Sequence, residues 1–193
     1  MSNTKRVVIV GIAGVGKSTV VNEVLSILET KNVKVDNLTF GTVMFEEAQK
    51  LGISDRDEMR TLSTDKQQEL QINAAKSIAN IESDIVIIDT HLFIKTTSGY
   101  MPGLPISILK SLLPTNLILV EALPQDVLDR RSNDPTRNRD ATTIESIELD
   151  NQIARSMLSS AGVLTGASLL VVLNSDGKSK EAAESIINSL DLD

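Results

Sequence analysis

The chain of 193 residues contains no cysteine and no tryptophan. The absence of cysteine excludes disulfide bonds and thiolate metal ligands, and it fits a reducing compartment. No apolar run approaches the length of a membrane span, and residues 1–6 lead into an apolar segment without the core of a signal peptide. We therefore expect a cytoplasmic protein with no membrane partner, held together by packing alone.

Aromatic residues and positive charge are also scarce. The chain has three Phe and one Tyr, and its formal net charge is −7 with a pI near 4.8. A nucleic-acid-binding protein normally presents a basic surface and aromatic side chains on which bases stack. The composition therefore argues against a nucleic-acid partner.

One motif is present in full. Residues 11–18 read Gly-Ile-Ala-Gly-Val-Gly-Lys-Ser and match G-x-x-x-x-G-K-[ST] at every fixed position. In this motif backbone N–H groups bind the α- and β-phosphates of a nucleotide, Lys17 reaches the β- and γ-phosphates, and the Ser18 hydroxyl can hold Mg²⁺. The flanks fit as well, because residues 6–10 predict a buried strand and apolar residues at helical spacing follow the loop. The motif therefore predicts a nucleotide site.

Four further apolar stretches have the length of strands. They occupy residues 33–40, 85–88, 117–120 and 169–173. Helical patterns separate them; we predict the last helix over residues 142–160, with a turn at residues 162–167 after it. Strands that alternate with helices predict a parallel sheet covered on both faces. Because the length suits one buried core, we expect a single α/β domain with a doubly wound five-stranded parallel sheet.

The segment near residues 41–81 is longer than a plain crossover between two parallel strands requires. It contains a first helical pattern at residues 42–48, then Arg56 and Arg60, then a longer helix that a capping box of Thr64 and Gln67 introduces. We interpret the additional turns around Arg56 as an added substrate-binding element.

Six of the eight arginines of this acidic chain gather in two places, and only Arg6 and Arg155 lie elsewhere. Arg56 and Arg60 form one pair, and a second group of four lies within ten residues, at Arg130, Arg131, Arg137 and Arg139. Guanidinium groups are preferred bidentate partners of phosphate, so two such clusters beside a phosphate-binding loop suggest that several phosphates are handled together. The alternative is two solvated charged faces, which charge runs commonly form.

The strand predicted at residues 85–88 ends in Asp89-Thr90-His91. Asp89 would lie at the carboxyl edge of the sheet beside the loop, where it could position Mg²⁺ through water together with Ser18; capping a turn is its alternative role. His91 is the only histidine, and we interpret it as a local hydrogen-bonding residue. Residues 99–105 predict a loop rich in glycine and proline that either presents backbone groups to a base or simply connects to the next helix.

The second arginine group includes a polar segment that Pro135 interrupts. An arginine-bearing segment near residues 130–141 could close over transferring phosphates, exclude water and stabilise negative charge. Its length predicts a short lid.

Six segments in order resemble the archaeal type of adenylate kinase, within the nucleoside monophosphate kinase group of P-loop kinases. They are residues 40–46, 55–60, 89–91, 99–105, 136–140 and 162–167. The resemblance covers nearly the whole chain. It implies reversible, Mg²⁺-dependent transfer of the ATP γ-phosphate to AMP to give two ADP, a short lid without zinc, and a homotrimer.

The resemblance also implies roles for individual residues. The ATP-binding residues would be Gly11, Ile12, Ala13, Gly14, Val15, Gly16, Lys17, Ser18 and Thr19, with Lys17 stabilising the phosphoryl group in transfer. The AMP-binding residues would be Thr42, Arg56, Arg60, Gly103, Leu104 and Pro105. From the lid, Arg131, Arg137 and Arg139 would act as catalytic residues that clamp the phosphates.

Two other functions use the same loop. A GTP-dependent switch or regulatory ATPase is one, but the guanine motif N-K-x-D is missing where residues 174–177 read Asn-Ser-Asp-Gly. A kinase for another nucleoside monophosphate or a small hydroxylated metabolite is the other. The arginine clusters favour a phosphorylated acceptor, since a hydroxyl acceptor would require a positioned base. They do not select the base of the acceptor.

Overall fold

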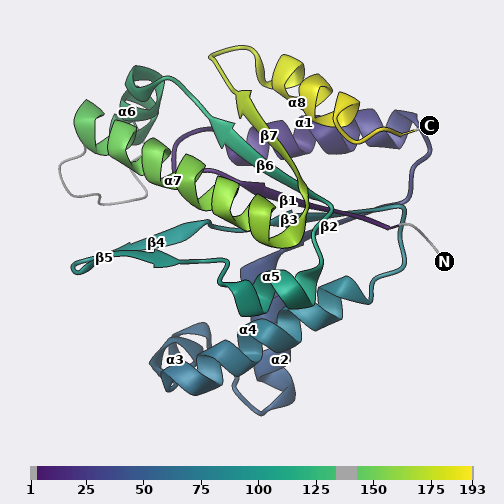
Figure 1. Ribbon diagram of the computed structural model, residues 1–193, viewed down its shortest axis with the longest axis vertical. Coiled ribbons are helices and arrows are strands. Elements are labelled where there is room, and N and C mark those ends of the chain that lie inside the picture. The colour runs from purple at the N-terminus through teal and green to yellow at the C-terminus, as the bar shows by residue number, and fades with distance from the viewer. Residues whose placement is uncertain (1–3, 134–142, 193) are drawn as a thin grey trace.

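The computed structural model describes residues 4–133 and 143–192, apart from the side chain of Arg60. Its centre is a five-stranded parallel sheet with the strand order β2-β3-β1-β6-β7 (Figure 1). The strands are β1 (Lys5–Val10), β2 (Val35–Thr39), β3 (Ile85–Asp89), β6 (Asn116–Glu121) and β7 (Ser168–Leu173). The predicted fold class is confirmed.

The inner strands are buried on both faces, as their continuous apolar sequences predict. All six residues of β6 are buried, and so are Ile85 to Ile88 of β3 and Val7 to Val10 of β1. Branched side chains at these positions pack well on a pleated surface. The central strands therefore form a well-packed support for the segments that follow their carboxyl ends.

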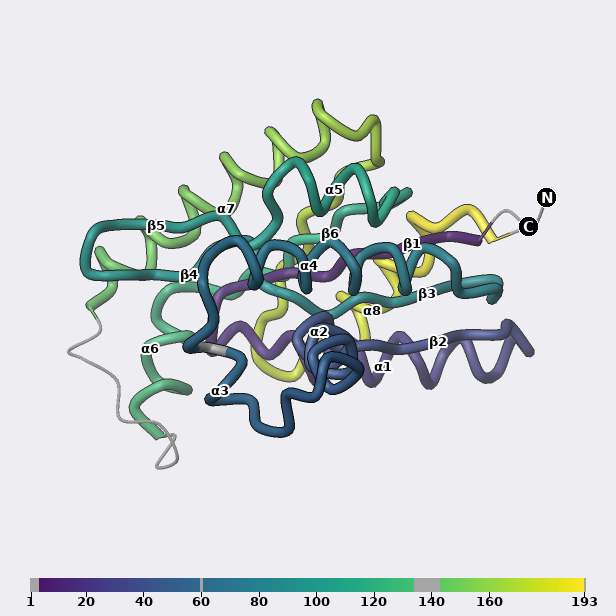
Figure 2. Tube along the Cα trace, turned by 90° about the horizontal axis from the view of Figure 1, so that it is seen from below, coloured from purple at the N-terminus to yellow at the C-terminus, as the bar shows by residue number. Residues whose placement is uncertain are grey.

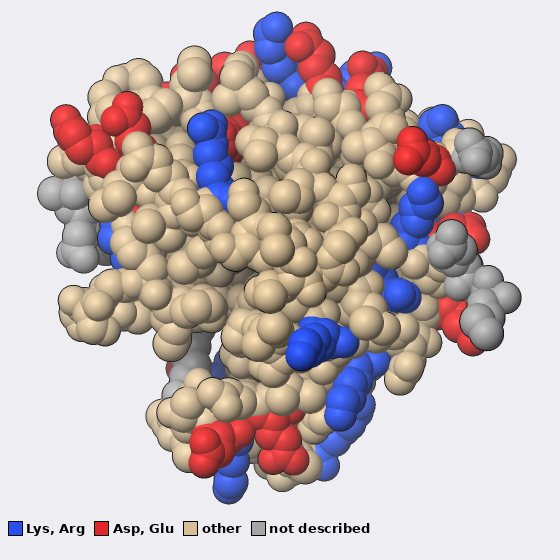
Figure 3. Space-filling view, viewed as in Figure 1, with Lys and Arg blue, Asp and Glu red and all other residues tan. Residues whose placement is uncertain are grey.

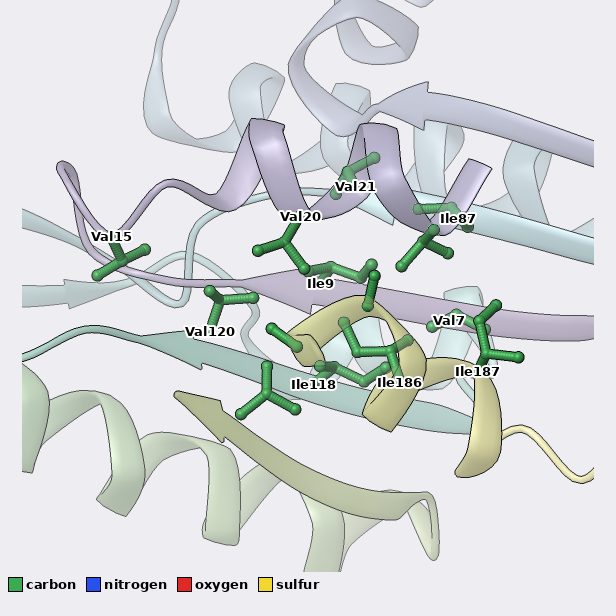
Figure 4. Packing of buried hydrophobic residues seen from close by; sticks show 14 of the residues in the cluster. Val7, Ile9, Val15, Val20, Val21, Ile87, Ile118, Val120, Ile186 and Ile187 are labelled. Atoms are coloured by element: carbon green, nitrogen blue, oxygen red, sulfur yellow. The ribbon is translucent and has the colours of Figure 1, made fainter. Parts of the chain in front are cut away.

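Two helices cover one face of the sheet, namely α1 (Lys17–Thr30) and α8 (Ser179–Asn188). Their apolar sides meet over β1, β3 and β6, as the packing of Val20, Ile186 and Ile9 shows (Figure 4). The last helix predicted from the sequence was residues 142–160, so α8 was not predicted. Its signal is the pair Ala182-Ala183 followed by Ile186-Ile187, a short stripe at helical spacing whose four residues are all buried.

The opposite face is covered by α4 (Thr64–Ala79), α5 (Ile106–Leu112) and α7 (Ile144–Thr165). Thr143 and Ser146 form a capping box at the start of α7, and Gly166 ends the helix in the left-handed conformation with φ of 73°. The turn predicted at residues 162–167 is therefore wrong in its first part, because α7 continues through Thr165. A short helix, α6 (Pro124–Ser132), follows β6.

Three helices between β2 and β3 form the lobe expected near residues 41–81. They are α2 (Phe40–Lys50), α3 (Arg56–Thr61) and α4. Ala48, Met59 and Leu70, one from each helix, make a small hydrophobic cluster apart from the two main ones. This local core lets the lobe keep its own shape beyond the edge of the sheet (Figure 1).

The segment predicted as a loop over residues 99–105 is in part a strand. β4 (Phe93–Thr96) and β5 (Gly99–Pro102) pair as an antiparallel hairpin that projects from the end of the molecule opposite to the start of β1 (Figure 2). Short four-residue strands of mixed polarity give little periodicity, which is why the sequence did not reveal them. None of the helices in the described part of the chain could span a membrane.

The hairpin is packed against the chain by Gly103, which donates its N–H to the Leu92 carbonyl at 2.8 Å. A Cβ on Gly103 would overlap the His91 carbonyl oxygen and lie 3.0 Å from the His91 carbonyl carbon, both of them backbone atoms that cannot swing away. We predict that Gly103→Ala lowers the free energy of unfolding by about 1–3 kcal/mol, as overpacking does.

Gly41→Ala is the matched control for this substitution, because a Cβ at Gly41 meets nothing within 4 Å. Alanine there should stabilise α2 by about 0.5–1 kcal/mol. Urea unfolding of the two variants measures both effects. Equal stabilities of Gly103→Ala and wild type would contradict the close packing of the hairpin.

Candidate active site

The predicted phosphate-binding loop lies between the carboxyl end of β1 and the start of α1. Val15 anchors it, since this side chain is fully buried in the core under α1 (Figure 4). Gly14 and Gly16 have φ of 95° and 78°, backbone angles that residues with a Cβ rarely adopt. The loop thus turns directly into a helix N-terminus, the position that favours anions.

Three side chains bind three consecutive carbonyls of this loop. Arg131 donates from Nε to Ala13 O at 2.8 Å, Arg130 donates from Nη1 to Gly14 O at 3.2 Å, and Asn174 donates from Nδ2 to Val15 O at 2.8 Å. The arginines lie at the end of α6, and Asn174 directly follows β7. Segments far apart in sequence therefore fix the loop from outside.

Lys17 is the first residue of α1 and lies largely buried, with 11% of its side chain exposed. Its Nζ forms an ion pair with Asp89 at the end of β3 and donates to Thr90 O at 3.2 Å. Burial lowers the pKa of Lys17 to about 8, although the contact with Asp89 favours the charged form. The structure thus brings Lys17 and Asp89 together beside the loop, with Ser18 exposed at the next position.

A pocket of about 250 Å³ opens next to the loop. Gly11 to Ala13 and Arg131 line one side of it. The other sides come from residues 91–93 after β3, from Lys95 on the hairpin, and from Asp150 and Ala154 on α7. His91 therefore lies at the edge of the candidate site, beside the segment that receives the hairpin.

A polar cluster that the sequence analysis missed closes this pocket on the side of α7. Asp150 is buried and accepts from Lys95 Nζ at 3.1 Å and from the Tyr100 hydroxyl at 2.6 Å. The Tyr100 ring packs edge-on against Phe93, with ring centroids 4.9 Å apart. The available signal was a carboxylate at the helical spacing of the buried residues Ile147 and Ala154, since a buried charge requires partners.

A second missed ion pair joins α7 to the sheet. Glu121 at the end of β6 is buried, and Arg155 binds it through two donors, Nε to Oε1 at 2.7 Å and Nη2 to Oε2. This contact raises the pKa of Arg155 above its ordinary value. The pair holds α7 beside the loop that carries the phosphate motif.

Of the residues predicted to bind the acceptor, the structure brings Thr42 and Arg56 together. Arg56 Nη2 donates to the Thr42 hydroxyl at 3.2 Å, and the guanidinium carbon lies 5.0 Å from the centre of the Phe45 ring. These contacts hold Arg56 on the lobe of α2 and α3. Figure 3 shows a notch in the surface between this lobe and the hairpin.

The other predicted site residues fall elsewhere. Gly103 packs on the backbone of His91, whereas Leu104 and Pro105 line a separate apolar groove between α5 and α7. The structure does not bring Leu104 and Pro105 into the pocket beside the loop. Arg137, Arg139 and the side chain of Arg60 lie outside the described residues.

Comparisons with known proteins agree with this arrangement. Residues 10–148 match a family model described as an AAA domain, so the chain belongs to this family. The adenylate kinase of Thermoplasma acidophilum is 42% identical over 189 residues, which are 97% of this chain and 100% of that protein. Those of Sulfurisphaera tokodaii and Methanococcus aeolicus are 40% and 38% identical, over 95% and 96% of this chain and 97% of each relative.

The chain belongs to the adenylate kinase family. Its fold is also that of more distant P-loop kinases. Shikimate kinase from Acinetobacter baumannii, solved in complex with shikimate, superposes with a TM-score of 0.59 at 14% identity, covering 100% of this chain and 97% of that one. Shikimate kinase from Aquifex aeolicus superposes with a TM-score of 0.53 at 18% identity, and the match covers 96% of this chain and 95% of that one. The resemblance to adenylate kinases, and the enzyme class that it implied, are confirmed.

We predict that Lys17 titrates with a pKa of about 8, well below that of an ordinary lysine, because burial penalises its charged form. NMR of protein with isotope-labelled lysine measures the titration, and Lys17→Arg assigns the signal by removing it. Asp89→Asn should lower this pKa further, since it removes the negative partner. Titration of the Lys17 signal at the ordinary lysine pKa would contradict the buried environment.

Proposed function

We propose that this protein catalyses the reversible transfer of the γ-phosphate of ATP to AMP, giving two ADP. The observation that carries the proposal is the fixed phosphate-binding loop, which lines a pocket of about 250 Å³ and begins the helix that carries Lys17. The contacts that hold Arg56 on the lobe support a second basic site. One nucleotide would bind at residues 11–19 and the other on the lobe.

At the donor side, backbone N–H groups of the loop and the N-terminus of α1 would bind the β- and γ-phosphates. Lys17 would leave Asp89 and follow the phosphoryl group, because the triphosphate offers it more negative charge than one carboxylate does. Its role is to stabilise charge that spreads over the oxygens in the transition state.

At the acceptor side, Thr42, Arg56 and Arg60 would hold AMP, and residues 103–105 would support the segment that encloses it. A phosphate monoester has a second pKa of about 6, so its attacking oxygen is already ionised near neutral pH. No strong general base is then needed. His91 accordingly has no proton-transfer role in this proposal, and positioning of the two phosphates governs the rate.

Mg²⁺ belongs to the proposal as the ion that accompanies ATP. The Ser18 hydroxyl and the Asp89 carboxylate, the latter through water, would hold it; both are oxygen ligands of the kind that Mg²⁺ prefers. Within the described residues no group of three or more His, Asp or Glu side chains could hold a metal alone. Mg²⁺ sites completed by substrate phosphates have few protein ligands, so this donor set fits. Bound there, the ion would neutralise charge on the β- and γ-phosphates.

The domain organisation follows from these roles. Residues 1–193 would form one P-loop kinase domain, with the AMP-binding insert near residues 41–81 and a short lid near residues 130–141. Arg131 from α6, with Arg137 and Arg139, would clamp the phosphates and exclude water. Arg131 already lines the pocket and binds Ala13 O, which supports its place in this set.

The acceptor is tested by incubating the protein with Mg-ATP and each nucleoside monophosphate separately. We predict that AMP gives ADP well above a control with ATP alone, and that UMP and CMP give far less product. Chromatography of the products measures both. If AMP yields no ADP beyond that control, the proposed reaction is wrong; UMP or CMP turning over faster than AMP would identify another monophosphate kinase.

Arg56→Gln sharpens this test, because it removes the charge that Thr42 and the Phe45 ring hold in place. The KM for AMP should rise about tenfold or more, as loss of a charge-assisted contact of about 1.5–3 kcal/mol implies. The KM for ATP should stay nearly unchanged. If the substitution raised the KM for AMP and the KM for ATP equally, Arg56 would not belong to the acceptor side.

We also propose a homotrimer in the cytoplasm, the compartment that the cysteine-free composition suits. The edge strand β7 presents Leu169, Val171 and Leu173 outward, each more than 40% exposed, and the adjacent end of α7 exposes Val163 and Leu164. Figure 3 shows few charged side chains over the middle of this face. A contiguous apolar surface of this kind supports a subunit interface.

Light scattering during size-exclusion chromatography tests the assembly. We predict a mass three times that of the 20.9 kDa chain. Val171→Lys should give a monomer, because it buries a charge in the interface. Leu51→Lys is the matched control, at an exposed leucine of the lobe, and should leave the mass unchanged. A wild-type monomer would contradict the proposed trimer.

A further inference from the structure

The three hydrogen bonds on the outside of the loop join consecutive peptide groups. Ala13 O, Gly14 O and Val15 O each accept from a different side chain. In a trans peptide the C=O and the N–H point in opposite directions. Holding the carbonyls of residues 13–15 outward therefore turns the N–H groups of Gly14, Val15 and Gly16 toward the inside of the loop, where the Val15 N–H makes a long bond of 3.4 Å to Ile12 O.

We infer that Asn174 and Arg130 are positioning residues of the donor site. Asn174 fixes the peptide group between Val15 and Gly16, and Arg130 fixes the one between Gly14 and Val15. The N–H groups of Gly16 and Val15 therefore face the phosphate site before a nucleotide binds. The inference rests on the proposed function only in taking residues 11–19 as the site of the triphosphate. The sequence placed Arg130 only in the arginine group of the predicted lid, and it did not predict Asn174 as a site residue.

Asn174 is placed firmly enough for this role. The residue is 4% exposed, and its backbone N–H donates to Glu121 O at 2.7 Å at the carboxyl end of the sheet. A Cβ on Gly16 would collide with Asn174 Nδ2, so the amide lies directly against the backbone of Gly16. The glycine with positive φ and the buried asparagine thus form one fitted contact.

Arg130 ties the same parts together from α6. Beyond its bond to Gly14 O, it donates from Nη2 to Asn174 O at 3.3 Å and from Nε to Asp176 at 3.1 Å. One guanidinium therefore spans the loop and the segment after β7. Because several donors of Arg130 are used at once, a rotamer change that releases the loop would also break its bonds to Asn174 O and Asp176.

The physical gain is pre-organisation. A loop whose glycines are free to rotate must order its N–H groups when the triphosphate binds, and this ordering weakens binding. Donors that are already oriented act on charge without reorganisation. Loss of Asn174 or Arg130 should therefore weaken binding of any polyphosphate at this loop, whatever base it carries.

Asn174→Asp tests the inference with a nearly isosteric change. The carboxylate cannot donate to Val15 O and repels it. We predict that calorimetry with Mg-ATP and with inorganic tripolyphosphate shows at least tenfold weaker binding of both. The KM for AMP should change less than twofold, and the KM for ATP should rise more than kcat falls.

Asn116→Asp is the matched control, a buried asparagine at the opposite end of the neighbouring strand β6. It should lower thermal stability without changing affinity for tripolyphosphate. Arg130→Gln is a second test at a residue with greater exposure, in case Asn174→Asp does not fold. Arg130→Gln should weaken the binding of both Mg-ATP and tripolyphosphate.

Each outcome decides a separate question. If wild type binds both ligands and the folded variants bind them equally well, the positioning role is wrong while the donor site stands. Weaker binding of ATP with unchanged binding of tripolyphosphate would also overturn it, since this would indicate a contact to the base. If wild type binds neither ligand, the proposed donor site itself fails.

Discussion

The arrangement of the whole site depends on one constraint, which is the anchoring of the phosphate-binding loop to the sheet from both sides. Val15 is buried in the core from within, and Ala13 O, Gly14 O and Val15 O are bound from without. Everything else is placed around this fixed point. β3 delivers Asp89 to Lys17, and β6 delivers Glu121 to Arg155, so that α7 forms a wall of the pocket.

Charge is distributed so that an acidic chain can still receive phosphates. Its net charge of −7 would repel a polyanion, yet the cations near the pocket are each held by a local partner: Lys17 by Asp89, Lys95 by Asp150, and Arg131 by Ala13 O. Such pairs keep the side chains in place at low energetic cost. A triphosphate competes well for them, since it carries more charge than one carboxylate or carbonyl.

The sequence was sufficient for the sheet, the loop and the lobe, because these follow from local patterns: apolar strands, a complete motif and helical periodicity. The sequence did not reveal site residues whose role depends on a contact with a residue far away along the chain. Asn174 lies 159 residues from its partner Val15, and Arg130 lies 116 residues from Gly14. The hairpin at residues 93–102 and α8 were missed for another reason, namely that their apolar patterns are too short to stand out.

The most direct test is a crystal structure of the protein with AMP and a non-hydrolysable ATP analogue. We expect the triphosphate on the N–H groups of Gly14 to Gly16, with Arg130 still on Gly14 O and Asn174 still on Val15 O. Lys17 should have moved from Asp89 to phosphate. The phosphate of AMP should face it across the pocket, on the side of Arg56. A triphosphate bound away from the loop, or AMP bound in the groove between α5 and α7, would contradict the account.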